Sequence, residues 1–178
     1  MKKLFILFAI CVSMMAGAQD TVNNFYINDN AILWSKKYPC AKSFNEAYLL
    51  FRISGEFMTI DTAGNKMFAE LRQLDADYKG AGFALMNTPI YISGGHINGF
   101  AVMSLKDSVF EIVIKKISIE QAYSAGSTRD LFHLEKGEKT DLEVYAINKN
   151  KSKFRDSFKV GPKILDYSFN KKFQSLIK

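Results

Sequence analysis

The chain has 178 residues, of which 48% are apolar, and this length and composition exclude a disordered chain and fit one domain with a sizeable core. The formal net charge is +6, but nine basic and only two acidic residues fall between Lys149 and Lys178. We interpret this basic segment as a solvated, lysine-rich face, and keep adhesion to an anionic surface through the same segment as an alternative.

The first 18 residues predict a cleavable secretory signal. Two lysines precede an apolar run, and Ala16 and Ala18 are the small residues that a signal peptidase recognises. The run is too short to cross a bilayer, which needs about 20 residues. Cys11 lies inside this run after a bulky isoleucine, so it does not predict a lipid anchor. We therefore expect residues 19–178 to form a single domain that lacks a transmembrane segment and is periplasmic or secreted. Export argues against nucleic acid as a partner.

The N-terminal part of the mature chain predicts two strands followed by a helix. Residues 25–27 alternate in polarity, residues 28–30 are typical of a turn, and AILWSKKY at 31–38 continues as a strand. Ser43 and Glu46 have the spacing of a capping box, in which each side chain satisfies a free backbone N–H at the start of a helix. That helix would place Phe44, Ala47, Tyr48 and Phe51 on one face. It would end at Gly55.

From residue 56 the apolar residues recur at every second position, which predicts strands. EFMTID (56–61) and KMFAELRQL (66–74) flank a turn, and TPIYIS (88–93) predicts a further short strand. INGFAVMSL (97–105) and SVFEIVIKKISI (108–119) flank Lys106-Asp107 and predict a hairpin. Its second strand would place three apolar residues on one face of the sheet. They are Phe110, Ile112 and Ile114.

The C-terminal part predicts a second amphipathic helix. TDLEVYAINKNKSKF (140–154) is compatible with either a helix or a strand. Gly161-Pro162 opens the last segment, and proline is favoured in a first helical turn. Leu165, Phe169, Phe173 and Leu176 then form one apolar stripe. Two such helices and a sheet with one apolar face predict an α+β domain in which both helices cover the same face of an antiparallel sheet.

Three segments carry a resemblance to a known family. They are AILWSKKY (31–38), INGFAVMSLKDSVFEIVIKKISI (97–119) and LEVYAINKNKSKFRDSFKVGPKILDYSFNKKFQSLI (142–177). They resemble a group of secreted proteins of unknown function from Bacteroidetes-type bacteria with a TATA-binding-protein-like (TBP-like) fold. The family's hairpin usually has a Lys-Asp-Gly turn, and here Ser108 replaces the glycine. The resemblance implies a curved antiparallel sheet with two helices packed on one face. It implies neither an activity nor DNA binding, because function belongs to sites rather than to folds.

We find no motif that predicts a catalytic, metal or cofactor site. Gly94-Gly95-His96 lacks the additional glycines and the following helix of a phosphate loop, so we interpret it as a turn or bulge between strands. The two histidines of the chain have no partner at metal-ligand spacing. Asp75 and Asp77 have the spacing of two carboxylates on one strand face, but we interpret them as the acidic end of a strand rather than a glycosidase pair.

The hypothesis that we favour is a non-catalytic binding or interaction module for an envelope protein, a glycan or a peptide. The candidate binding surface consists of aromatic residues in or near loops together with one histidine. These residues are Tyr78, Phe83, Tyr91, His96 and Tyr123. An exposed apolar or aromatic patch in the folded protein would support this hypothesis.

The alternative is a small periplasmic hydrolase. Its nucleophile would be Ser127 or Cys40 and its base His133 or His96. Triads are recognised by geometry and not by proximity in the sequence. Convergence of these side chains in one pocket would therefore support the hydrolase, and separation would oppose it.

Overall fold

The computed structural model describes residues 20–122, 136–148, 150 and 153–177, except for the side chain of Arg72. The predicted signal sequence, Tyr123, Ser127 and His133 lie outside these residues. The described chain forms one antiparallel sheet with the order β1-β2-β3-β7-β6-β5-β4, and β8 pairs with β7. The strands are β1 (Thr21–Val22), β2 (Phe25–Asn28), β3 (Ala31–Pro39), β4 (Phe57–Ala63), β5 (Lys66–Asp75), β6 (Gly95–Lys106), β7 (Val109–Gln121) and β8 (Lys139–Asp141).

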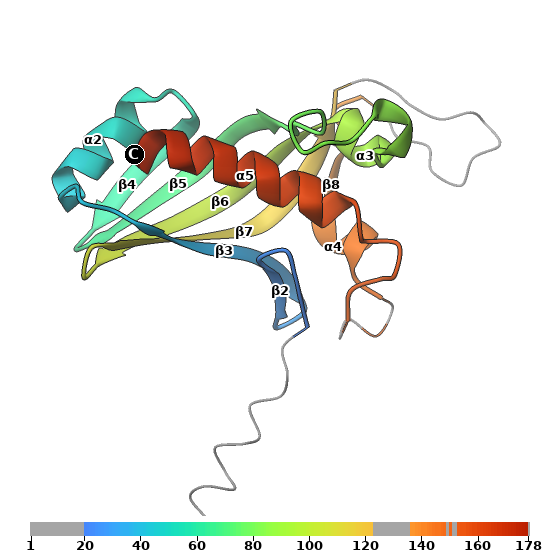
Figure 1. The fold of residues 1–178 in the computed structure, drawn as a ribbon, viewed down its shortest axis with the longest axis horizontal. Coiled ribbons are helices and arrows are strands. Elements are labelled where there is room, and N and C mark those ends of the chain that lie inside the picture. The colour runs from blue at the N-terminus through green and yellow to red at the C-terminus, as the bar shows by residue number, and fades with distance from the viewer. Residues whose placement is uncertain (1–19, 123–135, 149, 151–152, 178) are drawn as a thin grey trace, which may run out of the picture.

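The helices cover one face of this sheet and leave the other face open (Figure 1). They are α2 (Phe44–Ile53), the 3-10 turn η1 (Leu85–Asn87), α3 (Ile90–Ser93), α4 (Leu142–Ala146) and α5 (Gly161–Ile177). The long helix α5 lies along the sheet, with α2 beside its C-terminal end and α3 and α4 near its N-terminal end (Figure 1). The predicted α+β class, with two amphipathic helices on one face of a curved antiparallel sheet, is confirmed. None of the described helices is long and apolar enough to cross a membrane.

Aromatic side chains join the two long helices to the sheet. Phe173 of α5 stacks on Trp34 of β3 with ring centroids 5.9 Å apart and on Phe51 of α2 at 6.2 Å. Phe51 also stacks on Phe110 of β7 at 5.4 Å. All four side chains are fully buried. Contacts of this kind stabilise by about 0.5–1.5 kcal/mol per pair beyond the burial of apolar area, so α2 and α5 depend on the same cluster.

The start of α2 follows the predicted capping box. The Ser43 hydroxyl accepts a hydrogen bond from the Glu46 backbone N–H at 3.3 Å, and the Glu46 carboxylate accepts one from the Ser43 N–H at 2.7 Å. The Ser43 hydroxyl also donates to this carboxylate. These bonds lower the pKa of Glu46. Ala47 and Phe51 face the core as expected, and Gly55 adopts a left-handed φ of 71° just beyond the helix.

The predicted hairpin between β6 and β7 is confirmed, with its turn one residue later than expected. Lys106 pairs with Val109, and the two turn residues Asp107 and Ser108 have φ values of 49° and 59°. Two successive left-handed residues are typical of a type I′ turn, whose twist matches that of the strands. This conformation favours glycine, which Ser108 replaces.

The alternation of β7 shifts at a β-bulge. Phe110, Ile112 and Ile114 are buried beneath the helices, as the sequence predicts. Lys116 then adopts a left-handed φ of 52°, and the pairing with β6 skips one position. The residues buried beyond the bulge are Ile117, Ile119 and Gln121.

The prediction of a strand at residues 88–93 is wrong. Pro89 is the N-cap of α3, and η1 lies directly before it. A short apolar run does not distinguish a strand from a helix by periodicity alone. Gly94 therefore joins a helix to β6 instead of joining two strands. A Cβ atom at Gly95 would lie 2.7 Å from the Tyr91 backbone oxygen and would also overlap with Ile119, so the close approach of α3 to the sheet requires glycine here.

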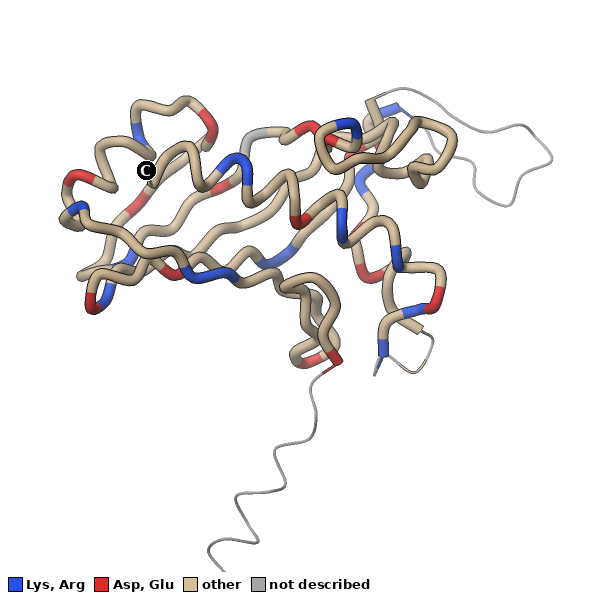
Figure 2. Tube along the Cα trace, viewed as in Figure 1, with Lys and Arg blue, Asp and Glu red and all other residues tan. Residues whose placement is uncertain are grey.

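Charges of both signs are interspersed over the described part of the fold (Figure 2). On the open face, Lys37 pairs with Glu111 at 3.6 Å, and Lys139 pairs with Glu120 at 3.3 Å. These two pairs offset part of the positive charge on the described open face.

Candidate binding groove between α3 and α4

The described residues of the predicted surface belong to three different parts of the fold: the segment after β5, α3 and β6. Tyr78 and Phe83 pack partly buried against the core in the segment after β5. His96 lies on β6 between the inward-facing Gly95 and Ile97, so its side chain is on the open face. There, its Nδ1 lies 2.6 Å from an Asp75 carboxylate oxygen. Tyr91 belongs to α3, and Tyr123 lies outside the described residues.

The geometry contradicts one version of the hydrolase hypothesis. Cys40 is 3% exposed, and its backbone N–H donates to Ser108 at the hairpin end of β7. His96 lies at the opposite end of β6. Cys40 and His96 therefore cannot form a nucleophile–base pair. Ser127 and His133 lie outside the described residues.

Asp75 and Asp77 line one cavity, but their carboxylates have different partners. Asp75 contacts His96, whereas Asp77 accepts a hydrogen bond from Lys171 of α5 at 2.7 Å. The Asp77 carboxylate also accepts one from the Gly80 N–H at 2.8 Å. The bond from Lys171, followed by the bond from Gly80, lowers the pKa of Asp77. These contacts agree with a structural role at the end of β5.

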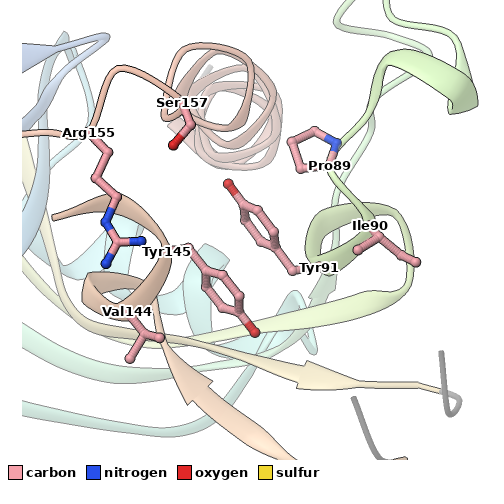
Figure 3. A pocket seen from close by; sticks show the side chains of 7 residues that line it. All are labelled: Pro89, Ile90, Tyr91, Val144, Tyr145, Arg155 and Ser157. Carbon is pink, nitrogen blue, oxygen red and sulfur yellow. The ribbon is translucent and has the colours of Figure 1, made fainter. Parts of the chain in front are cut away.

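A cavity of about 330 Å³ lies between α3, α4 and the segment that precedes α5 (Figure 3). We call it the α3–α4 groove. It is lined by Pro89, Ile90, Tyr91, Val144, Tyr145, Arg155 and Ser157. Its volume falls in the range of about 300–1,000 Å³ that is typical of small-ligand sites.

Two stacked tyrosines form one wall of the groove. The rings of Tyr91 and Tyr145 are 4.1 Å apart and inclined by only 6°, and their hydroxyls point in opposite directions (Figure 3). Burial, with a smaller contribution from Tyr145, raises the pKa of Tyr91 to about 12, so its phenol stays protonated and can donate a hydrogen bond. The Tyr145 hydroxyl is buried and forms no hydrogen bond with a described residue.

Arg155 contributes the positive charge of the groove. Its Nε–H donates to the Ile147 backbone oxygen at 2.6 Å, and its backbone N–H donates to the Ala146 oxygen at 2.7 Å. These bonds attach Arg155 to the C-terminal end of α4. The guanidinium points toward Val144 and Tyr145 (Figure 3) and forms no ion pair with a described residue.

Exposed apolar side chains surround the entrance. Ile90 of α3 is 53% exposed and Val144 of α4 is 54% exposed. Just before α3, Leu85 and Met86 of η1 are 59% and 96% exposed. Ile90 and Val144 therefore present apolar surface at the groove itself, and exposed apolar surface of this kind can mark an interaction site.

A second cavity of about 550 Å³ lies on the other side of Arg155 and shares Val144 with the groove. Its lining includes the carboxylates of Asp141 and Glu143. Glu143 already accepts a hydrogen bond from the Ile32 backbone N–H at 2.7 Å. The two sides of Arg155 therefore differ in charge, since no carboxylate is among the described residues that line the α3–α4 groove.

Only Tyr91 of the groove was among the residues that the sequence singled out. Tyr145 and Val144 lie in the segment that is compatible with a helix or a strand, and Arg155 lies in the basic C-terminal segment. The spacing of Leu142, Tyr145 and Ala146 is that of a helix, and it was the sequence signal that could have predicted α4. Val144 and Tyr145 are neighbours in this helix and therefore point in different directions.

No protein-family model matches the chain, and no curated protein matches it. A TBP-like protein from Parabacteroides distasonis ATCC 8503 aligns with a TM-score of 0.46 and 11% identity, over 84% of this chain and 92% of that one. A DUF4468 family protein from Bacteroides ovatus ATCC 8483 aligns with a TM-score of 0.47 and 13% identity, over 90% of this chain and 89% of that one. Both descriptions agree with the resemblance found in the sequence. Similarity at this level says nothing about a ligand or an activity.

Proposed function

We propose that this protein is a non-catalytic binding module, exported to the periplasm or secreted, and that its ligand occupies the α3–α4 groove. The observation that supports this most is the presence of exposed apolar side chains and two stacked tyrosines around one cavity. A ligand that covers Ile90 and Val144 removes apolar surface from water, which contributes about 25 cal/mol per Å².

The contents of the groove favour binding over hydrolysis. Among the described residues that line the groove, Ser157 is the one serine or threonine. The same described lining contains neither a histidine nor an acidic residue that could act as its base. A serine without an adjacent base is a weak nucleophile. Ser157 is suited to donating a hydrogen bond to a ligand.

The alternative of adhesion through the basic C-terminal segment has less support. Lys171 pairs with Asp77 at 2.7 Å, and Lys172 pairs with Glu56 at 2.6 Å. These pairs reduce the positive potential that α5 presents. Surface adhesion by charge alone would also weaken with salt, whereas an apolar groove would not.

The experiment that tests the proposal is a thermal-shift screen of peptides and glycans against the mature protein, followed by NMR mapping of any ligand. We expect the perturbed signals to lie in α3, α4 and the segment around Arg155. Val144→Glu, which places a charge at the entrance, should abolish binding. Met58→Glu is the matched control, because Met58 is 65% exposed and belongs to β4, which lies at the other end of the fold from α3 and α4 (Figure 1). Ligands that bind both variants equally, or that map to the open face of the sheet, would contradict the proposal.

A further inference from the structure

We infer that the α3–α4 groove recognises a carboxylate attached to an apolar group, and that Arg155 anchors the carboxylate. This inference rests on the proposed function, because it assigns a ligand chemistry to the same groove. It begins with charge: the described lining contains one cation, Arg155, and no anion. A half-enclosed site with one unpaired guanidinium favours a ligand of opposite charge.

The guanidinium is oriented before a ligand arrives. The bond from its Nε–H to the Ile147 oxygen fixes one edge of the planar group. One terminal nitrogen points toward Tyr145 (Figure 3), and Arg155 lines the groove. A planar guanidinium that is held in this way can donate two parallel hydrogen bonds to a carboxylate, and it loses less side-chain entropy on binding than a lysine would.

Two hydroxyls supply further donors. The Tyr91 hydroxyl points toward Ser157 across the groove (Figure 3). Burial raises the pKa of Tyr91 to about 12, so its phenol is protonated at neutral pH and can donate, and the Ser157 hydroxyl can rotate to suit a ligand.

The remaining surfaces accept an apolar group. Pro89, Ile90 and Val144 line the groove, and Ile90 and Val144 are half exposed. The aromatic wall next to Arg155 adds a flat apolar surface. On the far side of Arg155, the carboxylates of Asp141 and Glu143 would repel an anion. Charge thus places the ligand carboxylate on the tyrosine side of Arg155 and its apolar group toward the entrance.

Two kinds of ligand carry a carboxylate attached to an apolar group: the C-terminal residue of a peptide, and a fatty acid. The experiment is isothermal titration of the mature protein with two pairs of probes. One pair is N-acetyl-Leu-Phe with a free carboxylate and the same peptide as its C-terminal amide. The other pair is decanoate and decanol below their aggregation limits.

We expect at least one acid to bind about tenfold or more tightly than its neutral counterpart, because charge-assisted hydrogen bonds are lost in the amide or the alcohol. Preference for the peptide acid alone identifies a peptide C-terminus, and preference for decanoate alone identifies a fatty acid. Equal binding of acid and neutral probes would overturn the carboxylate inference while the proposed function stands. Absence of binding by both acids at millimolar concentration would also overturn it, and the library screen would then decide the proposed function.

Substitutions of Arg155 test whether its guanidinium binds the ligand carboxylate. Arg155→Gln should bind the acid about tenfold or more weakly and bind the neutral probe as the wild type does. Lys159→Gln is the control, since it removes the same charge from an exposed position outside the groove. Arg155→Lys, which keeps the charge but loses the fork of donors, should retain only part of the preference.

If Arg155 served only to cap α4, Arg155→Gln would lower stability while the ratio of acid to neutral affinity stayed unchanged. That result would overturn the assignment. The ratio measured on the wild type does not depend on the folding of any variant. For the peptide acid, the ratio should stay constant between about pH 5 and pH 9 and disappear as the C-terminal carboxyl is protonated near its pKa of about 3.5.

Discussion

Gly95 shows how one residue can be required by the packing around it rather than by its own φ. It begins β6 directly after α3, where the sheet and the helix approach each other too closely for a Cβ atom. The backbone oxygen of Tyr91 lies on one side and Ile119 of β7 on the other. The position of Tyr91 in the groove therefore depends on a residue that never contacts the ligand.

Gly95→Ala should destabilise the protein by about 2 kcal/mol or more, because a backbone atom and a buried side chain must both move. Urea unfolding measures this change. Gly64→Ala is the comparison, since Gly64 has a φ of 58° but no atom within 4 Å of its would-be Cβ, and it should cost about 1 kcal/mol. Equal costs at the two positions would show that the close approach of α3 to the sheet has no energetic consequence.

Asp77 gives a pH-dependent prediction. Its folded-state pKa is lowered, first by the bond from Lys171 and then by the bond from the Gly80 N–H. Its contribution to stability is therefore present above the unfolded pKa of about 3.9 and is lost as the pH falls through the folded pKa.

Asp77→Asn should consequently be less stable than the wild type at about pH 7 and equally stable at about pH 2. Urea unfolding at several pH values gives the difference. Asp61→Asn, which removes an exposed carboxylate from β4, serves as the control for loss of a surface charge. A difference between Asp77→Asn and wild type that is independent of pH would mean that the amide fails for a steric reason instead.

At the scale of elements, α5 is held by its aromatic stripe more than by its ends. Phe173 contacts rings of β3, α2 and β4, so it links three elements that are far apart in the sequence. Phe173→Ala should lower the free energy of unfolding by about 3–5 kcal/mol. Gln174→Ala, on the exposed side of the same turn, should have almost no effect. A small loss for Phe173→Ala would indicate that α2 and α5 do not share one core.

The β6–β7 hairpin predicts a stabilising change. Ser108 has a φ of 59° in a turn of two left-handed residues. Ser108→Gly should raise the free energy of unfolding by about 0.5–1 kcal/mol, because glycine adopts this conformation without steric cost. Thermal unfolding provides the measurement, with Ser104→Gly on the adjacent strand expected to destabilise instead. A lower midpoint for Ser108→Gly would imply that the serine side chain stabilises the turn.

The elements that could be predicted from the sequence have local determinants. The Ser43–Glu46 capping box and the stripe at Leu165, Phe169 and Phe173 act over a few residues, so they are visible in the sequence alone. Residues 88–93 were mispredicted because a short apolar run suits a strand as well as a helix. The groove was not predictable, because Tyr91, Tyr145 and Arg155 come from separate segments that only the tertiary fold brings together.

At the scale of the whole molecule, the described fold has different surfaces at its two ends. The α3–α4 end combines a cavity, stacked tyrosines and a guanidinium with exposed apolar residues. The other end also exposes apolar side chains, namely Leu49 and Ile53 on α2 and Met58 on β4. Among these three, Met58 lines a cavity, which lies on the open face of the sheet and also contains charged side chains. Shape and charge together, rather than apolar exposure alone, therefore distinguish the end that we assign to binding.

The bulge at Lys116 bears on how distant relatives should be compared. A homologue that lacks this one residue would alternate regularly along the whole strand, and its residues equivalent to Ile117 and Ile119 would still face the helices. A sequence alignment of this strand with such a homologue therefore needs a one-residue gap at the bulge. Without the gap, the buried positions beyond the bulge would be matched with exposed ones, and the homologue would wrongly seem to lack these core residues.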